Sequence, residues 1–188
     1  APSDANVVWA GTGETFIRSD ISQGNGIYKS TDAGKTWKCV GLENTGRIGR
    51  IAIDPRNPDV VFAAAMGHAY GPQQERGVYR TADGGKTWER VLFVDENTGC
   101  SDIAMDPSNP RILYAGMWPM LIRTWGKWSG GPGGSLHVSR DGGTTWTRLK
   151  GSGLPDTEIG KVGLAVSASN PNRVYALIET AAEGLWRS

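Results

Sequence analysis

The chain has 188 residues, of which 38% are hydrophobic, and this is ample material for a packed core. The formal net charge of +1 argues against nucleic acid or any other polyanion as a partner, and no apolar run is long enough for direct insertion into a membrane. The 27 glycines and 10 prolines, with no sustained period of 3.6 residues, predict an all-β chain that has many turns and almost no helix.

Aromatic residues mark four copies of one repeat, at intervals of 53, 52 and 61 residues: Trp9, Phe62, Tyr114 and Tyr175. The two clearest copies place an Asp-Pro-x-Asn-Pro turn between two apolar runs, which predicts a pair of strands, A and B. Two further strands, C and D, follow in each copy. In the second copy the four strands are predicted at roughly residues 47–54, 59–66, 77–81 and 88–93.

The turn between strands C and D carries the pattern Ser/Thr-x-Asp-x-Gly-x-Thr-Trp, at residues 30–37, 81–88 and 139–146. In such a turn the carboxylate can accept backbone N–H bonds, the glycine can adopt a positive φ, and the tryptophan can pack the turn onto the sheet. We therefore assign structural roles to the carboxylates, glycines and tryptophans of this pattern, which are Asp32, Gly34, Trp37, Asp83, Gly85, Trp88, Asp141, Gly143 and Trp146.

This pattern resembles the Asp-box, or BNR repeat, of sialidases, sortilin/VPS10 domains and related β-propellers. The resemblance implies a β-propeller whose blades are four-stranded antiparallel sheets, with the Asp-box turns between strands C and D. The chain then holds about three and a half blades: 1–46 lacks strand A, 47–99 and 100–158 are complete, and 159–188 is truncated at strand C. We expect an open arc of a larger propeller, partnered by the remaining blades or by a self-associated copy.

Features that could suggest a cofactor have simpler explanations. The Gly-Lys-Thr runs at 34–36 and 85–87 lack the earlier glycine and the following helix of a phosphate-binding loop, so we expect no nucleotide. Only two histidines are present, and each patterned turn offers a single carboxylate, so we expect no metal and no other cofactor. The two cysteines, Cys39 and Cys100, fall on distant parts of their blades and are expected to be unpaired thiols.

The long, divergent loops join strands B to C and D to A, so they share one face of a propeller and form the expected binding surface. The B–C loops cover roughly 12–25, 67–76 and 117–134, and the D–A loops 41–46, 94–100 and 150–158. Aromatic rings beside cationic side chains suit stacking on a sugar or gripping a peptide, although the rings could equally pack between loops or on another domain. The candidate ligand-binding residues are Phe16, Arg18, His68, Tyr70, Arg76, Trp118, Arg123, Trp125 and Trp128.

Longer runs of sequence carry the resemblance further. They are GRIGRIAIDPRNPDVV at 46–61, GHAYGP at 67–72, ERGVYR at 75–80 and VDENTG at 94–99. Together they resemble the large bacterial sortilin/VPS10-like proteins with BNR repeats, over essentially the whole chain. The resemblance implies an extracytoplasmic protein, secreted, periplasmic or on the cell surface. It also implies a non-catalytic scaffold that binds a peptide, a protein or a glycan through its B–C and D–A loops.

The alternative is an enzyme, namely a glycoside hydrolase of the sialidase-like or xyloglucan-active kind. Xyloglucan-active propellers that carry Asp-boxes use two carboxylates across a cleft, and the loops of this chain hold several acidic residues. The Phe/Tyr-Arg-Ile-Pro motif of sialidases is absent. Acidic loop residues also commonly serve in turns and surface ion pairs, and the candidates here are Glu14, Asp20, Glu75, Asp95 and Glu96.

Overall fold

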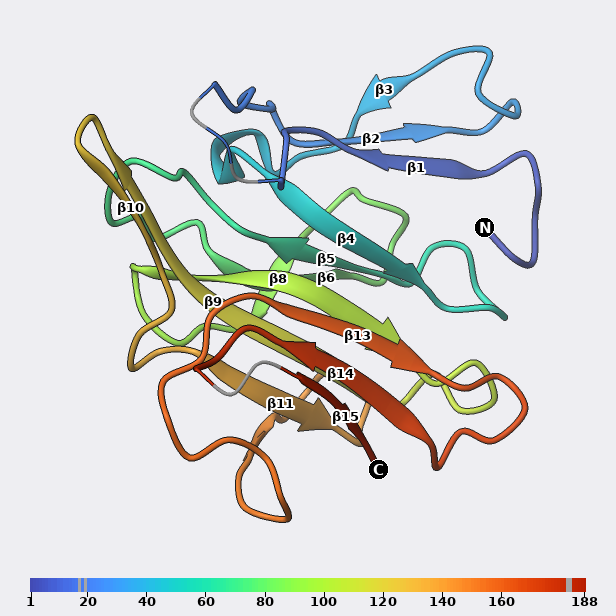
Figure 1. Ribbon diagram of the computed structural model, residues 1–188. Helices are drawn as coiled ribbons and strands as arrows, with labels where there is room; N and C mark the ends of the chain where they lie inside the picture. Colours follow the sequence, from blue (N-terminus) through green and yellow to red (C-terminus); the bar gives the residue numbers. More distant parts are fainter. Residues whose placement is uncertain (17, 19, 182–183) are drawn as a thin grey trace.

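The computed structural model describes residues 1–16, 18, 20–181 and 184–188, and it consists of four antiparallel β-sheets (Figure 1). The first sheet contains β1 (Val8–Gly11), β2 (Ile27–Ser30) and β3 (Lys38–Cys39). The second contains β4 (Ile48–Ile53), β5 (Val61–Ala65), β6 (Gly77–Thr81) and β7 (Glu89–Leu92), so all four strands predicted for the second repeat are present.

The third sheet is the largest and has five strands, ordered β10-β9-β11-β12 with β8 also paired to β9. They are β8 (Thr98–Met105), β9 (Leu113–Arg123), β10 (Gly126–Ser129), β11 (Ser135–Ser139) and β12 (Thr147–Leu149). The fourth sheet contains β13 (Val162–Val166), β14 (Val174–Ile178) and β15 (Gly184–Arg187). Within the described residues, the only helical element is one 3-10 turn, Glu43–Thr45. The chain is therefore an all-β segment of a β-propeller.

The sheets pack face to face, as propeller blades do, and apolar side chains fill the space between them. Every residue of β5 is buried, because one of its faces packs toward the first sheet and the other toward the third. Phe62 joins Leu113 and Met117 in one core cluster, whereas Val61 and Ala63 join Trp9 and Ile27 in the next. The alternation along β5 thus connects three successive sheets.

The repeated turns between strands C and D form a closed set of hydrogen bonds. Asp83 accepts bonds from the hydroxyls of Thr81 and Thr87, at 2.8 and 2.6 Å, and from the backbone N–H of Thr87 at 3.0 Å. Asp32 and Asp141 accept the equivalent bonds in their own turns. These donors favour the charged carboxylate, so the pKa of Asp32 falls to about 2, chiefly through the backbone N–H of Thr36.

The expectation of a loop over 117–134 is wrong, because most of this segment forms a β-hairpin. Strand β9 continues to Arg123, and β10 returns beside it with Lys127 opposite Ile122 and Ser129 opposite Met120. The reason is the apolar alternation of Trp118, Met120 and Ile122, which buries one face of the extension against Ile21, Met66 and Ala69. Both cysteines are free thiols.

Candidate functional site

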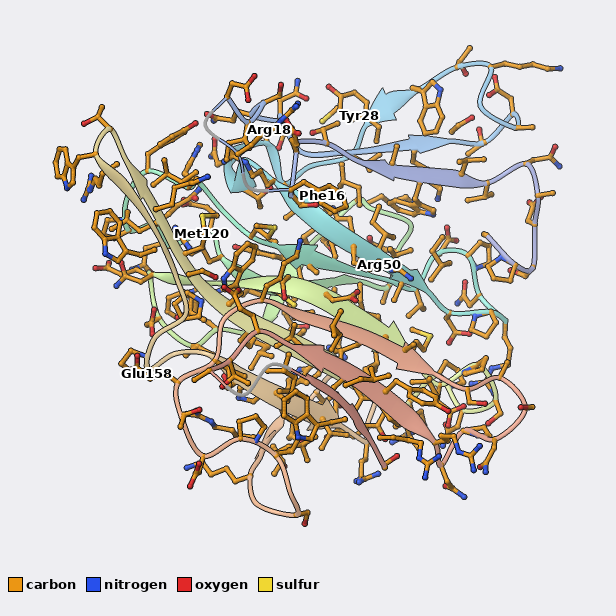
Figure 2. The ribbon with its side chains drawn as sticks, in the orientation of Figure 1. Phe16, Arg18, Tyr28, Arg50, Met120 and Glu158 are labelled. Carbon is orange, nitrogen blue, oxygen red and sulfur yellow. The ribbon has the colours of Figure 1, made fainter. Side chains whose placement is uncertain are left out.

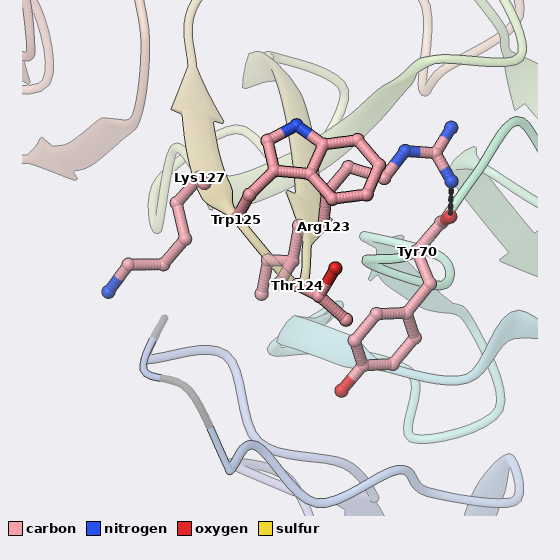
Figure 3. Close-up of a pocket in the computed structure, with 7 residues that line it drawn as sticks. Tyr70, Arg123, Thr124, Trp125 and Lys127 are labelled. Atoms are coloured by element: carbon pink, nitrogen blue, oxygen red, sulfur yellow. Dashed lines mark hydrogen bonds between the residues drawn. The ribbon is translucent and has the colours of Figure 1, made fainter.

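The β9–β10 hairpin and the segments that lie against it form two adjoining hollows. We call this region the hairpin surface. The first hollow, of about 590 Å³, is lined by Tyr70, Ile122, Arg123, Thr124, Trp125, Gly126 and Lys127 (Figure 3). The second, of about 370 Å³, is lined by Phe16, Trp118, Met120, Lys127, Trp128, Ser129, Lys161 and Glu179. In Figure 2, Met120 lies on β9.

The first hollow is built where the loop after β5 docks on the hairpin. The backbone N–H of Ile122 donates to the carbonyl of Ala69 at 2.6 Å, and Arg123 Nη1 donates to the carbonyl of Tyr70 at 3.0 Å (Figure 3). These bonds fix the backbone of Tyr70, which lines this hollow together with Trp125, a residue that is 80% exposed. The result is an apolar hollow with cationic side chains at its rim, an arrangement that suits an aromatic-stacking ligand.

The second hollow holds an ammonium group between two aromatic rings. Lys161 Nζ lies 4.8 Å from the ring centroid of Phe16 and 5.3 Å from that of Trp118, within the range of cation–π attraction. It also donates to the carbonyl of Thr15 at 3.4 Å. Burial lowers the pKa of Lys161, and the negative charges of Asp102 and Glu179 oppose that shift.

One carboxylate of the second hollow is held in place by its neighbours. Glu179 Oε2 accepts a hydrogen bond from the Ser129 hydroxyl at 2.5 Å and another from the backbone N–H of Lys161 at 2.8 Å. Ser129 Oγ in turn accepts a bond from Trp118 Nε1 at 2.8 Å. This chain of bonds joins β10 to the end of β14 and fixes the wall of the hollow.

The hairpin surface brings together six of the nine candidate ligand-binding residues: Phe16, Tyr70, Trp118, Arg123, Trp125 and Trp128. The expectation that Trp118 lies in a loop is wrong. It lies on β9 at 4% exposure, because its ring fills the space beneath the hairpin. Trp128 is 48% exposed and Phe16 is 76% exposed, so these rings can meet a ligand directly.

Arg76 lies at the end of the loop between β5 and β6, as expected, but its side chain does not reach the surface. Its guanidinium is buried and donates to the carbonyls of Asn97, His68 and Gly71, so it ties two loops together from inside. Burial lowers the pKa of Arg76 to about 10. His68 is partly buried, and burial also lowers its pKa, with the nearby positive charge of Arg47 adding to the shift.

The five candidate catalytic carboxylates do not line either hollow of the hairpin surface. Glu14 pairs with Arg18 at 2.8 Å, and the hydrogen bond from Arg18 lowers the pKa of this carboxyl, which is unfavourable for a general acid. Asp20 lies 3.5 Å from the same guanidinium. Asp95 accepts bonds within its own turn, and Glu96 lies 3.4 Å from the side-chain amide of a neighbouring loop. Glu75 is not among the lining residues.

Burial raises the pKa of the Asp102 carboxyl. The hydrogen bonds of this side chain indicate a structural role. Its Oδ2 atom accepts from the backbone N–H of Leu164 at 2.8 Å, and its Oδ1 atom accepts from the N–H of Ile103 at 2.9 Å. Arg50 Nε lies 3.7 Å from Oδ1. Asp102 therefore links β8 to β4 on one side and to β13 on the other.

Three polar residues of the second hollow were not predicted from sequence: Ser129, Lys161 and Glu179. They come from three separate strand ends, and only the packing of the fourth sheet beside the hairpin brings them together. Among the described residues, no group of three or more His, Cys, Asp or Glu side chains could hold a metal ion. In the same part of the chain, no helix is long and apolar enough to cross a membrane.

Comparison with known proteins relates the chain to several propeller families. The family model described as sortilin, neurotensin receptor 3 (Sortilin-Vps10) matches residues 25–152. The xyloglucanase of Hypocrea jecorina is 25% identical over 173 residues, covering 80% of this chain and 19% of that protein. The photosystem II assembly lipoprotein Ycf48 of Trichormus variabilis is 29% identical over 143 residues, covering 65% of this chain and 41% of that protein.

The fold agrees with these relationships. The crystal structure of an ancestral GH74 enzyme superimposes with a TM-score of 0.69 and 26% identity, covering 100% of this chain and 22% of that one. The chain thus spans only about a fifth of the length of the xyloglucanase and of the GH74 structure that it matches.

Proposed function

The chain belongs to the Sortilin-Vps10 family, and from this membership we propose that it is a non-catalytic binding scaffold that recognises a peptide, protein or glycan outside the cytoplasm. The observation that carries the proposal is the pair of adjoining hollows on the hairpin surface, where exposed aromatic rings stand beside cationic side chains. Exposed apolar surface with a few polar groups beside it is typical of a ligand-binding site.

The hairpin surface rests on a rigid part of the third sheet, and this rigidity favours ligand recognition. The hairpin extends directly from β9, whose inner half is paired on both sides by β8 and β11. The bonds from Ile122 and Arg123 to the neighbouring loop fix the position of the rings relative to the second sheet. A preorganised surface loses little conformational entropy when a ligand binds, so modest contacts suffice for affinity.

The relatives support both ligand classes and the location. Similarity to a xyloglucanase supports a glycan, whereas membership of the Sortilin-Vps10 family and similarity to a photosystem II assembly lipoprotein support a protein or peptide. The name lipoprotein also supports a place outside the cytoplasm. We further propose that the three repeated turns are Asp-boxes of the BNR type with a structural role, since their carboxylates bond inside their own turns.

Glycoside hydrolysis is the second candidate function, and similarity to the xyloglucanase and to the GH74 structure favours it. Such an enzyme needs two carboxyl groups on opposite sides of a bound sugar. Within the described residues, each hollow of the hairpin surface offers at most one carboxylate, that of Glu179, and its Oε2 atom already accepts two bonds. This arrangement supports binding over cleavage.

The test is a screen of the full-length protein against a glycan array and a peptide array, run beside turnover assays on aryl glycosides and xyloglucan oligosaccharides. The proposal predicts saturable binding of one ligand class with no product formed. Turnover that disappears when Glu14, Asp20, Glu75, Asp95 or Glu96 is changed to the corresponding amide would overturn it and support the hydrolase.

A further inference from the structure

The second hollow has a chemical selectivity that the proposed function does not specify. Resting on that function, we infer that this hollow binds a hexuronic acid, a sugar unit of a glycan that carries a single carboxylate. Lys161 recognises that carboxylate. Three features of the hollow support this selectivity: two exposed rings, an ammonium group between two aromatic side chains, and a fixed carboxylate acceptor in the wall.

The rings suit a sugar rather than a purely apolar ligand. Phe16 and Trp128 present exposed aromatic faces to the hollow, and such faces stack on the C–H groups of a pyranose ring. The indole N–H of Trp118 is already bonded to Ser129, so this ring serves as a floor. A hollow of about 370 Å³ is in the size range of a small-ligand site.

Among the residues that the structure describes, the ammonium group of Lys161 forms no ion pair. It donates one long hydrogen bond, of 3.4 Å, to the Thr15 carbonyl, and the carboxylates of Asp102 and Glu179 attract it from farther away. The two rings remove part of its water, and a charge pair in such a setting attracts more strongly than one in open solvent. A ligand carboxylate would therefore form a charge-assisted bond where a neutral hydroxymethyl group would form a weaker one.

Glu179 limits how much negative charge the hollow accepts. Its carboxylate is fixed by Ser129 and by the backbone of Lys161, and its remaining acceptor capacity suits the hydroxyls of a sugar. Two lysines and one glutamate line the hollow, which leaves one net positive charge to match one carboxylate. An acidic peptide with several carboxylates would bring some of them against Glu179, so the charge balance favours a monoanionic sugar.

The experiment compares two disaccharides that differ at one carbon, cellobiouronic acid and cellobiose, by NMR titration of the full-length protein. We expect the acid to bind at least tenfold more tightly, since a bond to a charged group is worth roughly that factor or more. Lys161→Gln should remove this preference, and Lys161→Met, which keeps the aliphatic stem between the rings, should do the same. The matched control Lys35→Gln, in an exposed patterned turn, should leave both affinities unchanged.

Each alternative outcome is informative. Equal affinity for the two disaccharides, or a preference that survives both Lys161 variants, overturns the inference while the proposed binding function stands. If a glutamate-rich peptide binds in a Lys161-dependent manner and neither disaccharide binds, the inferred sugar ligand is wrong and the ligand is a peptide. Cleavage of either disaccharide would instead overturn the proposed non-catalytic function.

Discussion

The ring of Phe62 lies directly against the backbone of Gly143, so a Cβ atom on this glycine would stand 2.5 Å from Phe62 Cε1. Phe62 belongs to strand B of the second repeat, and Gly143 belongs to the patterned turn of the third. The same relationship recurs one sheet earlier, where a Cβ on Gly85 would stand 3.1 Å from a ring atom of Trp9. The recurring aromatic and the recurring glycine are thus two halves of one contact between neighbouring sheets.

This contact predicts that Gly143→Ala is more destabilising than Gly142→Ala. Both glycines have a positive φ, of 81° and 76°, so both alanines carry similar backbone strain. Only the Cβ at position 143 meets Phe62, whereas the Cβ at position 142 meets nothing within 4 Å. Overpacking should add about 1–3 kcal/mol to the loss of unfolding free energy at position 143, measured by urea denaturation. Equal losses for the two variants would show that the ring contact does not matter.

The patterned turns predict a loss of stability in Asp83→Ala. The variant removes the acceptor for four hydrogen bonds, so the thermal midpoint should fall. Lys86→Ala is the matched control, because Lys86 contributes only its backbone N–H to the same carboxylate. The hydroxyl of Thr87 is the main cause that keeps the pKa of Asp83 below its ordinary value, so this stabilisation is present above pH 3.8 and is lost as the pH falls through the folded-state pKa.

The two tryptophans of the second hollow should respond differently to truncation. Trp118→Ala removes a ring that is 4% exposed and should cost about 3–5 kcal/mol of unfolding free energy through the cavity that it leaves. Trp128→Ala removes a ring that is 48% exposed and should cost less than about 1 kcal/mol. Chemical denaturation of both variants checks this difference. A Trp118 variant as stable as the wild type would contradict the buried position of this ring.

His137 predicts a loss of stability in mild acid. Burial lowers its pKa from 6.5 to about 4 in the folded chain, and the positive charge of Arg148 on the paired strand adds to the shift. Between these values the unfolded chain binds a proton that the folded chain does not, so the unfolding free energy should decrease by about 3 kcal/mol as the pH falls from 6.5 to 4. His137→Leu should reduce this decrease. A smaller decrease should remain, because the pKa of His68 is also lowered in the folded chain. A wild-type unfolding free energy that does not change over this range would contradict the burial.

Much of the fold was predictable because its signals are local and repeated. The Asp-Pro-x-Asn-Pro turns and the patterned turns each define a strand pair, and together they predicted the four strands of the second repeat and the all-β class. The β9–β10 hairpin was missed because the whole segment 117–134 was interpreted as one long, divergent loop. The alternation of Trp118, Met120 and Ile122 was the signal that could have revealed it.

The candidate site was less predictable because it depends on contacts between distant strand ends. The exposed rings of Trp125 and Trp128 could be expected from the crowding of tryptophans in one segment. Lys161 and Glu179 could not, since nothing near them in the sequence distinguishes them from other charged residues that flank a strand. The burial of Arg76 could not be predicted either, because its terminal nitrogens bond to three backbone carbonyls that only the folded loops bring together.

Whether the hairpin surface is a non-catalytic binding site is best decided by the binding isotherm of the Trp125→Ala/Trp128→Ala variant. It is measured with the ligand that the arrays identify, and intact ligand is quantified afterwards. Both rings are exposed, so the thermal midpoint should match that of the wild type. We expect at least tenfold weaker binding, because stacking faces on both hollows are lost, and full recovery of intact ligand from the wild type. An unchanged isotherm, or a ligand that the wild type converts to product, would contradict this expectation.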